Sequence, residues 1–216
     1  MAVLHPRRSS QRTLVVDAAL SCIARQGIHK TTADDVAREA GLSRATLYRA
    51  FPGGKEAVLK AAVETEVARL FSGLAVAMSE PGDLEGVLVA AMVEAARQLS
   101  SHPALHTLIE DEPGVVLPHL AFDRMGRMLR TASEFTAPFL APWLGPEEAG
   151  PSAEWAVRVF LSYVVCPRPG TDLTDVEDVR QLVETFVVPG IEALGRRGRA
   201  SGHDRGREYR RKELRA

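Results

Sequence analysis

The side chains best suited to chemistry in this sequence are hydrogen-bond donors that stand close together. Residues 43–49, SRATLYR, hold two arginines, two hydroxyl residues and a tyrosine, and Lys55 follows shortly after. An arginine can donate two hydrogen bonds to O6 and N7 of guanine, whereas hydroxyl and ammonium groups suit phosphate oxygens. This set of donors predicts contact with nucleic acid.

Two short helices are expected to position these donors. The run Thr32-Ala-Asp-Asp35 has the form of a capping box and predicts a helix that ends at Gly41. Ser43 is a ready N-cap for a second helix over residues 44–51, and Pro52-Gly53-Gly54 breaks the chain again. Two helices joined by a turn that contains glycine form a helix-turn-helix, whose second helix enters the major groove of DNA.

We therefore expect DNA contacts from the start of the second helix and from the residues around it. Arg44 and Thr46 are the expected base readers, and phosphate or solvent contact is the alternative for both. Tyr48 and Lys55 suit phosphate. The full set of candidates is Thr32, Ser43, Arg44, Ala45, Thr46, Tyr48, Arg49 and Lys55.

Around these residues the sequence resembles the TetR (tetracycline-repressor-like) family of bacterial regulators. The similar run covers residues 12–59 and includes a first helix that ends at Gly27, the motif AGLS at 40–43 and the motif TLY at 46–48. Three features depart from the family pattern. They are Ala50 in place of the frequent His or Tyr, the turn Pro52-Gly53-Gly54-Lys55, and Ile23 in place of the usual Phe.

The resemblance implies a homodimeric repressor that binds palindromic, double-stranded operator DNA and is released by a small-molecule effector. It also implies that the C-terminal helices form the effector pocket and the dimer contact.

The charges along the chain support a division into three parts. Residues 1–55 carry nine basic and four acidic side chains, residues 56–195 carry nine and twenty-one, and residues 196–216 carry nine and three. The hydrophobic period is helical nearly everywhere, which predicts an all-α fold. We expect a three-helix DNA-binding domain at 1–55, a helical ligand-binding and dimerisation domain at 56–195, and a basic, disordered tail at 196–216.

Two apolar helices are predicted at 152–166 and 175–194, separated from the preceding helix by a loop at 142–152. They suit either burial within one chain or a four-helix dimer interface. The interface candidates are Trp155, Val159, Tyr163, Val179, Val183 and Phe186. Adaptable side chains could line a pocket for a hydrophobic effector, although each could equally be ordinary core. These pocket candidates are Met78, Met92, His106, Phe122, Met125 and Phe160.

Other classes of protein find little support in the sequence. No apolar stretch reaches the length of a membrane span, and no secretory signal is recognisable, so a cytoplasmic protein is expected. Cys22 and Cys166 form neither a disulfide framework nor a zinc pattern, and Cys166 is expected to be buried. His102 and His106 have a spacing that a metal could use, but no metal, cofactor or catalytic set is expected. The alternative function is an all-helical enzyme or interaction module that uses the acidic helical body.

Overall fold

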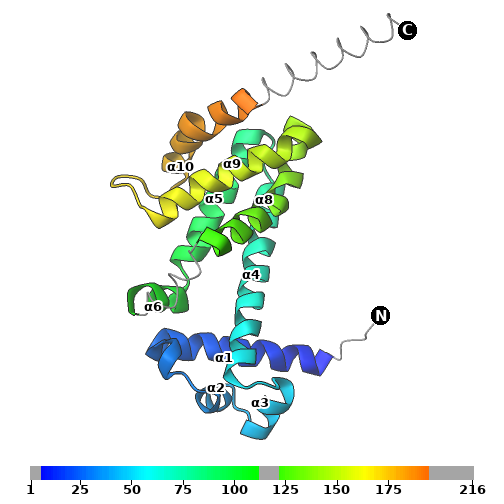
Figure 1. Ribbon diagram of the computed structural model, residues 1–216, viewed down its shortest axis with the longest axis vertical. Coiled ribbons are helices and arrows are strands. Elements are labelled where there is room, and N and C mark those ends of the chain that lie inside the picture. The colour runs from blue at the N-terminus through cyan, green and yellow to red at the C-terminus, as the bar shows by residue number, and fades with distance from the viewer. Residues whose placement is uncertain (1–5, 112–121, 195–216) are drawn as a thin grey trace, which may run out of the picture. The chain divides into compact units, whose positions relative to one another are not determined.

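The computed structural model describes residues 6–111 and 122–194, and over these residues it contains helices and connecting turns but no strand (Figure 1). The predicted all-α fold is therefore confirmed. The predicted disordered tail lies outside the described residues. The helices are α1 (Pro6–Lys30), α2 (Ala33–Glu39), α3 (Arg44–Ala50), α4 (Lys55–Ser79), α5 (Leu84–Ser100), α6 (Pro103–Asp111), α8 (Phe122–Leu144), α9 (Pro146–Val165), α10 (Val176–Leu182) and the π-helical turn η2 (Val183–Val187).

Packing divides the chain into two units. Among the described residues, the first unit comprises 6–72 and 98–111, and the second comprises 73–97 and 122–194. The first unit contains α1, α2, α3, α6 and most of α4, so the domain boundary predicted at residue 55 falls inside it. α4 continues through both units as one helix.

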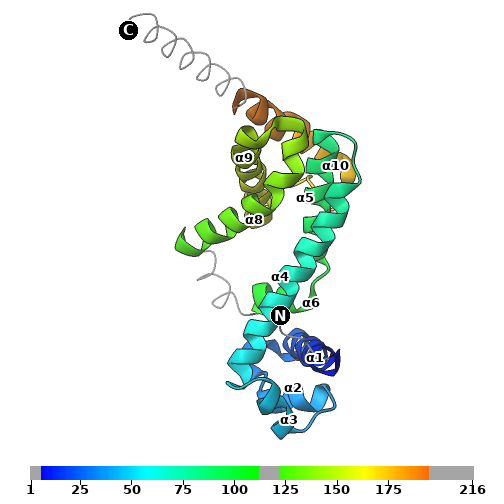
Figure 2. The same cartoon turned by 90° about the vertical axis from the view of Figure 1, so that its right-hand side faces the viewer.

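The core of the first unit joins α1 to the two short helices that follow it, and both views show these three helices side by side (Figures 1 and 2). Val15 and Val16 of α1 are almost fully buried, as are Val36 of α2 and Leu47 of α3. Because Leu47 has no exposed surface, it anchors α3 to this core, and its truncation to alanine would cost about 2–5 kcal/mol of stability.

The opposite side of α1 meets α6. The hydroxyl of Thr107 in α6 donates to the carbonyl of Ala24 in α1 at 3.0 Å. α1 itself is interrupted where the sequence predicts its end, since Gly27 has a non-helical φ of 80°. In the first unit, α2 and α3 therefore lie on one side of α1, and α6 lies on its other side. α4 begins in this unit.

The second unit buries residues from each of its helices. Leu88 of α5, Leu140 of α8, Ala153 of α9 and Val179 of α10 are at most 1% exposed. The helix that begins at α10 continues past Pro189 to residue 194, as predicted. The π-helical turn η2 precedes this proline, and in it the N–H of Val188 donates to the carbonyl of Val183, five residues back.

Two expectations for this part of the chain are wrong. The predicted loop at 142–152 is reduced to a break at Gly145, because a proline at the first helical position, Pro146, starts α9 without losing a hydrogen bond. Cys166 is exposed rather than buried, because α9 ends at Val165 and the chain turns away into a loop.

Candidate nucleic-acid interface

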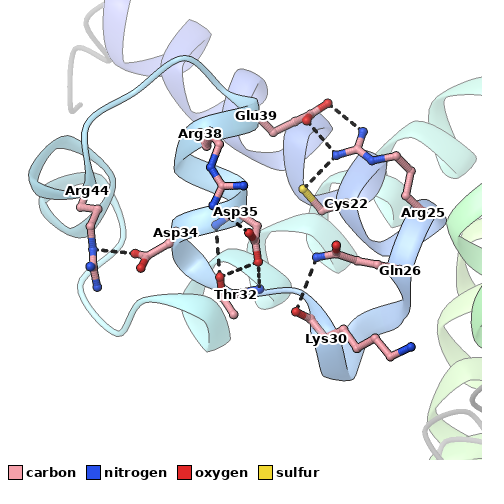
Figure 3. Close-up of polar contacts among 10 residues, drawn as sticks. All are labelled: Cys22, Arg25, Gln26, Lys30, Thr32, Asp34, Asp35, Arg38, Glu39 and Arg44. Carbon is pink, nitrogen blue, oxygen red and sulfur yellow. Dashed lines mark hydrogen bonds and ion pairs between the residues drawn. The ribbon is translucent and has the colours of Figure 1, made fainter.

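The capping box at the start of α2 is present as predicted. The hydroxyl of Thr32 accepts a hydrogen bond from the backbone N–H of Asp35 at 3.2 Å, and the Asp35 carboxylate accepts from the backbone N–H of Thr32 at 3.1 Å. The same carboxylate accepts from the Thr32 hydroxyl at 2.6 Å (Figure 3). These bonds lower the pKa of Asp35 because they stabilise its charged form. Thr32, a predicted DNA contact, therefore lies at the surface with its hydroxyl engaged in the cap.

An ion pair joins the C-terminal end of α2 to α1. Arg25 donates from both terminal nitrogens to the two carboxylate oxygens of Glu39, at 2.9 and 2.7 Å (Figure 3). This paired geometry lowers the pKa of Glu39 and raises that of Arg25. Cys22 lies beside it, and burial raises the pKa of its thiol.

The turn between α2 and α3 requires a glycine at one position. Gly41 has a φ of 66°, and a Cβ there would meet no atom within 4 Å, so backbone conformation alone requires glycine. After the turn, the Ser43 hydroxyl accepts from the backbone N–H of Thr46 at 3.2 Å and caps α3 as predicted. The two hydroxyls are 2.9 Å apart, so the Thr46 side chain is already part of the cap.

α3 presents its polar side chains outward. Leu47 is buried, while Ser43, Arg44, Ala45, Tyr48 and Arg49 are exposed. The structure thus brings the predicted contacts at 43–49 together on one helix and its cap. Such a helix, exposed at its N-terminal end, matches the element that helix-turn-helix proteins insert into the major groove.

Arg44 has a partner that the sequence analysis missed. Its Nε lies 2.6 Å from the Oδ1 of Asp34 in α2, and both side chains remain partly exposed (Figure 3). This ion pair involves the Nε of Arg44 and does not engage its two terminal nitrogens. The only signal in the sequence was an acidic residue in the first turn of α2, and that signal is equally explained by the helix dipole.

Gly54 supports the ring of Tyr48. Its φ is 62°, and a Cβ at this position would approach Cε1 of Tyr48 to 3.0 Å. The turn Pro52-Gly53-Gly54-Lys55, which departs from the family pattern, therefore has a packing role, since the backbone of Gly54 lies against the ring of Tyr48. Tyr48 keeps 45% of its surface exposed.

Lys55 ties the start of α4 to the end of α1. Its ammonium group donates to the carbonyl oxygens of Ile28 at 2.5 Å and His29 at 3.4 Å. A cation at the carbonyl end of a helix is stabilised both by the hydrogen bonds and by the helix dipole. The structure thus gives Lys55 an intramolecular role, and its contact with phosphate stays a prediction.

Five of the six predicted dimer residues separate into two groups, and the sixth, Tyr163, is half-buried. Val179 and Val183 have no exposed surface and Val159 is 8% exposed, so all three belong to the core of their own unit. Trp155 and Phe186 are 38% and 46% exposed, and the indole N–H of Trp155 donates to the Phe186 carbonyl at 3.2 Å. Only exposed side chains can bury new surface, so the three valines are unsuited to an interface.

The predicted effector residues are not all in one place. Met78, Met92 and Phe160 are buried in the second unit, and His106 lies in the first unit, where its ring contacts the carbonyl of Ser100. A cavity of about 710 Å³ between α8 and α9 is lined by other residues, among them Leu129, Ser133 and Ala149. The side chains of Phe122 and Met125 lie outside the described residues.

Metal and membrane sites are not seen in the described part of the chain. Residues 6–111 and 122–194 contain no group of three His, Cys, Asp or Glu side chains placed to hold a metal ion. No helix in the same ranges combines the length and the apolar character that crossing a bilayer requires.

The fold and the exposed, capped α3 together define a helix-turn-helix DNA-binding protein. A family model described as "Bacterial regulatory proteins, tetR family" matches residues 15–62, which are α1 from Val15 onward, α2, α3 and the start of α4. Residues 15–62 therefore match the DNA-binding region of the tetR family of regulatory proteins, and the chain is a DNA-binding transcriptional regulator similar to members of that family.

Relatives of similar length support this assignment. The chain is 27% identical over 192 residues to the uncharacterised HTH-type transcriptional regulator Rv1255c from Mycobacterium tuberculosis, which covers 88% of this chain and 89% of that protein. The fold of this chain is similar to that of the TetR family repressor AlkX from Dietzia, a protein implicated in biodegradation of n-alkanes. The TM-score is 0.59 and the identity 23%, and the match covers 90% of this chain and 100% of that one. The fatty acid degradation regulator FadR from Bacillus halodurans has a TM-score of 0.54 and 21% identity, with coverage of 84% and 96%. The alternative interpretation as an all-helical enzyme is not supported by these relatives.

Proposed function

We propose that this chain is a cytoplasmic, homodimeric repressor that binds palindromic operator DNA and is released by a small hydrophobic effector. The observation that carries the DNA-binding part is the exposed N-terminal end of α3, where Arg44 stands next to the Ser43 cap. In this proposal Arg44 reads guanine, and Thr46 and Ala45 approach neighbouring base edges. Tyr48, Arg49 and Lys55 contact phosphates and set the register of the helix on the duplex.

A dimer explains how two short recognition helices obtain sufficient affinity. Two copies of α3 must lie about 34–36 Å apart to enter successive major grooves on one face of the duplex, which requires a two-fold arrangement and a palindromic site. The exposed aromatic side chains Trp155 and Phe186 are the best candidates for the contact between copies, together with the half-buried Tyr163.

α4 is the proposed link between effector and DNA. It begins at Lys55, directly after the recognition helix, and carries the buried Met78 near its other end. An effector bound among Met78, Met92 and Phe160 would favour one orientation of α4, and operator DNA would favour another. Effector and DNA then weaken each other's binding by the same factor.

Selection from randomised DNA duplexes tests the proposal. The full-length protein should enrich a palindrome with two equal half-sites separated by about one helical turn, and its affinity should fall steeply as salt increases. Enrichment of a non-palindromic sequence would refute the symmetric dimer. Binding of all duplexes with equal affinity would refute sequence-specific repression.

A further inference from the structure

The first unit contains a cavity that belongs neither to the proposed DNA contacts nor to the proposed effector residues. It has a volume of about 280 Å³ and lies between α1, α4 and α6. Most of its wall is aliphatic, with Leu20 and Ile23 from α1, Leu59 and Ala62 from α4, and Leu105 from α6. An apolar cavity of this kind does not hold water well, because water finds too few hydrogen-bond partners there.

The rim of the cavity is also apolar. Val63 and Val67 line it from α4 and are 64% and 44% exposed. Two neighbouring aliphatic side chains that face solvent at the mouth of an aliphatic cavity leave apolar surface unburied. A ligand that covers them gains the hydrophobic free energy of that surface.

One end of the cavity is polar, and the carboxylate that lines it is paired with an arginine. The Nδ1 of His102 accepts from the backbone N–H of Leu105 at 3.1 Å, so the ring proton is on Nε2, which lies 3.1 Å from Oε2 of Glu66. The other oxygen of Glu66 accepts from Arg69 at 2.6 Å, and Arg69 also donates to Asp17 at 2.8 Å. This end offers hydrogen bonds, and the carboxylate that lines it, Glu66, is already paired with Arg69, which favours an uncharged ligand.

We propose that this cavity binds an uncharged, mainly aliphatic small molecule with one polar end, which lies at the His102–Glu66 pair. An apolar cavity of about 150 Å³ accommodates benzene, so a cavity of this volume suits about ten heavy atoms. A peptide helix, about 10 Å across with its side chains, is too wide to enter.

The walls of the cavity connect it to the DNA-binding helices. The side of α1 that bears Val15 and Val16 packs on α2 and α3, while Leu20 and Ile23 reach the cavity. Lys55 holds the start of α4 to the end of α1. A ligand that separates α1 from α4 therefore displaces the helices against which α3 packs, and this displacement weakens DNA binding. This consequence rests on the proposed function, whereas the binding itself does not.

The test uses 1-octanol and the full-length protein. Isothermal titration calorimetry should show saturable binding of one molecule per chain. Val63→Trp places an indole at the mouth of the cavity and Ala62→Leu fills its interior, and each should weaken binding at least tenfold. Val76→Trp is the matched control, because Val76 is 61% exposed on the same helix and does not line the cavity, and it should leave binding unchanged.

Absence of saturable binding to the unaltered protein would overturn the proposal. Equal binding by the unaltered protein and the Val63→Trp variant would also overturn it, and this variant changes an exposed position where folding is little affected. Operator binding without octanol is measured separately. A chain that binds octanol but no DNA would refute the proposed function and leave the cavity site standing.

Discussion

Replacing Arg44 with alanine tests the part of the interface that carries sequence information. The Nε of Arg44 lies 2.6 Å from Oδ1 of Asp34, so in the proposed complex the two terminal nitrogens of the guanidinium donate to O6 and N7 of a guanine. Loss of such a bidentate contact costs about 1–3 kcal/mol, which is about 5–150-fold in affinity. The loss should be largest for the preferred base pair in each half-site, and discrimination there should relax.

Asp34 provides a second arm of the same experiment. The Arg44 and Asp34 side chains are 69% and 39% exposed, and an exposed ion pair is worth about 0.2–1 kcal/mol. Asp34→Ala should therefore lower discrimination at that base pair by about 1.4–5-fold. In a protein that already carries Arg44→Ala, the same substitution should change discrimination little, because the two residues act as one unit.

Fluorescence anisotropy on the selected duplex and on single-base variants measures both effects, repeated at several salt concentrations. Arg168→Ala is the control for net charge, since Arg168 is exposed in the loop after α9. An Arg44→Ala protein that loses the same factor on every duplex would show a phosphate contact and refute base reading. Retention of full discrimination by Asp34→Ala would refute the role given to the ion pair.

The remaining predictions concern stability and assembly. Lys55→Met should lower the free energy of unfolding, measured in urea, by about 1–2 kcal/mol, because two carbonyls lose a charged donor. It should also weaken binding to all DNA sequences equally and reduce the salt slope of binding by about one. A loss of binding restricted to one sequence would contradict the phosphate contact. Asp35 and Glu39 have pKa values below their ordinary 3.8 and 4.5, so the folded state binds fewer protons than the unfolded state. Their stabilisation should be complete above about pH 5 and should be lost as the pH falls through their lowered values, and thermal unfolding of Asp35→Asn against pH should show a shallower acid limb. Phe186→Glu should convert the dimer to folded monomer in sedimentation, whereas Val76→Glu should not; a persistent Phe186→Glu dimer would remove Phe186 from the interface.

The helix-turn-helix could be predicted because its signals act over one helical turn. The Thr32–Asp35 box and the Ser43 cap each join residues three apart, so the bonds form whenever the helix forms. Gly27 and Gly41 also have local roles, since each adopts a positive φ where a helix ends. Neither kind of signal depends on the rest of the fold.

The expectations that differ from the structure have a common origin in packing. An almost wholly apolar segment is compatible with a core or with an interface, and the sequence alone does not distinguish the two. Val179 and Val183 therefore entered the predicted interface although their own unit buries them completely. The loop predicted before α9 reflected its prolines and glycines, but Pro146 at a helix start promotes the helix instead.

By itself, the sequence determined the helices, their caps and the set of donors on α3, because these depend on residue types within a few positions of one another. Only the tertiary structure decided which partners these donors have. Asp34 reaches Arg44 from ten positions away, and Lys55 reaches the carbonyl of Ile28 from twenty-seven. The cavity between α1, α4 and α6 also depends on packing, since its lining residues span positions 20 to 108. Contacts over such separations exist only after the helices have packed, so no local pattern predicts them.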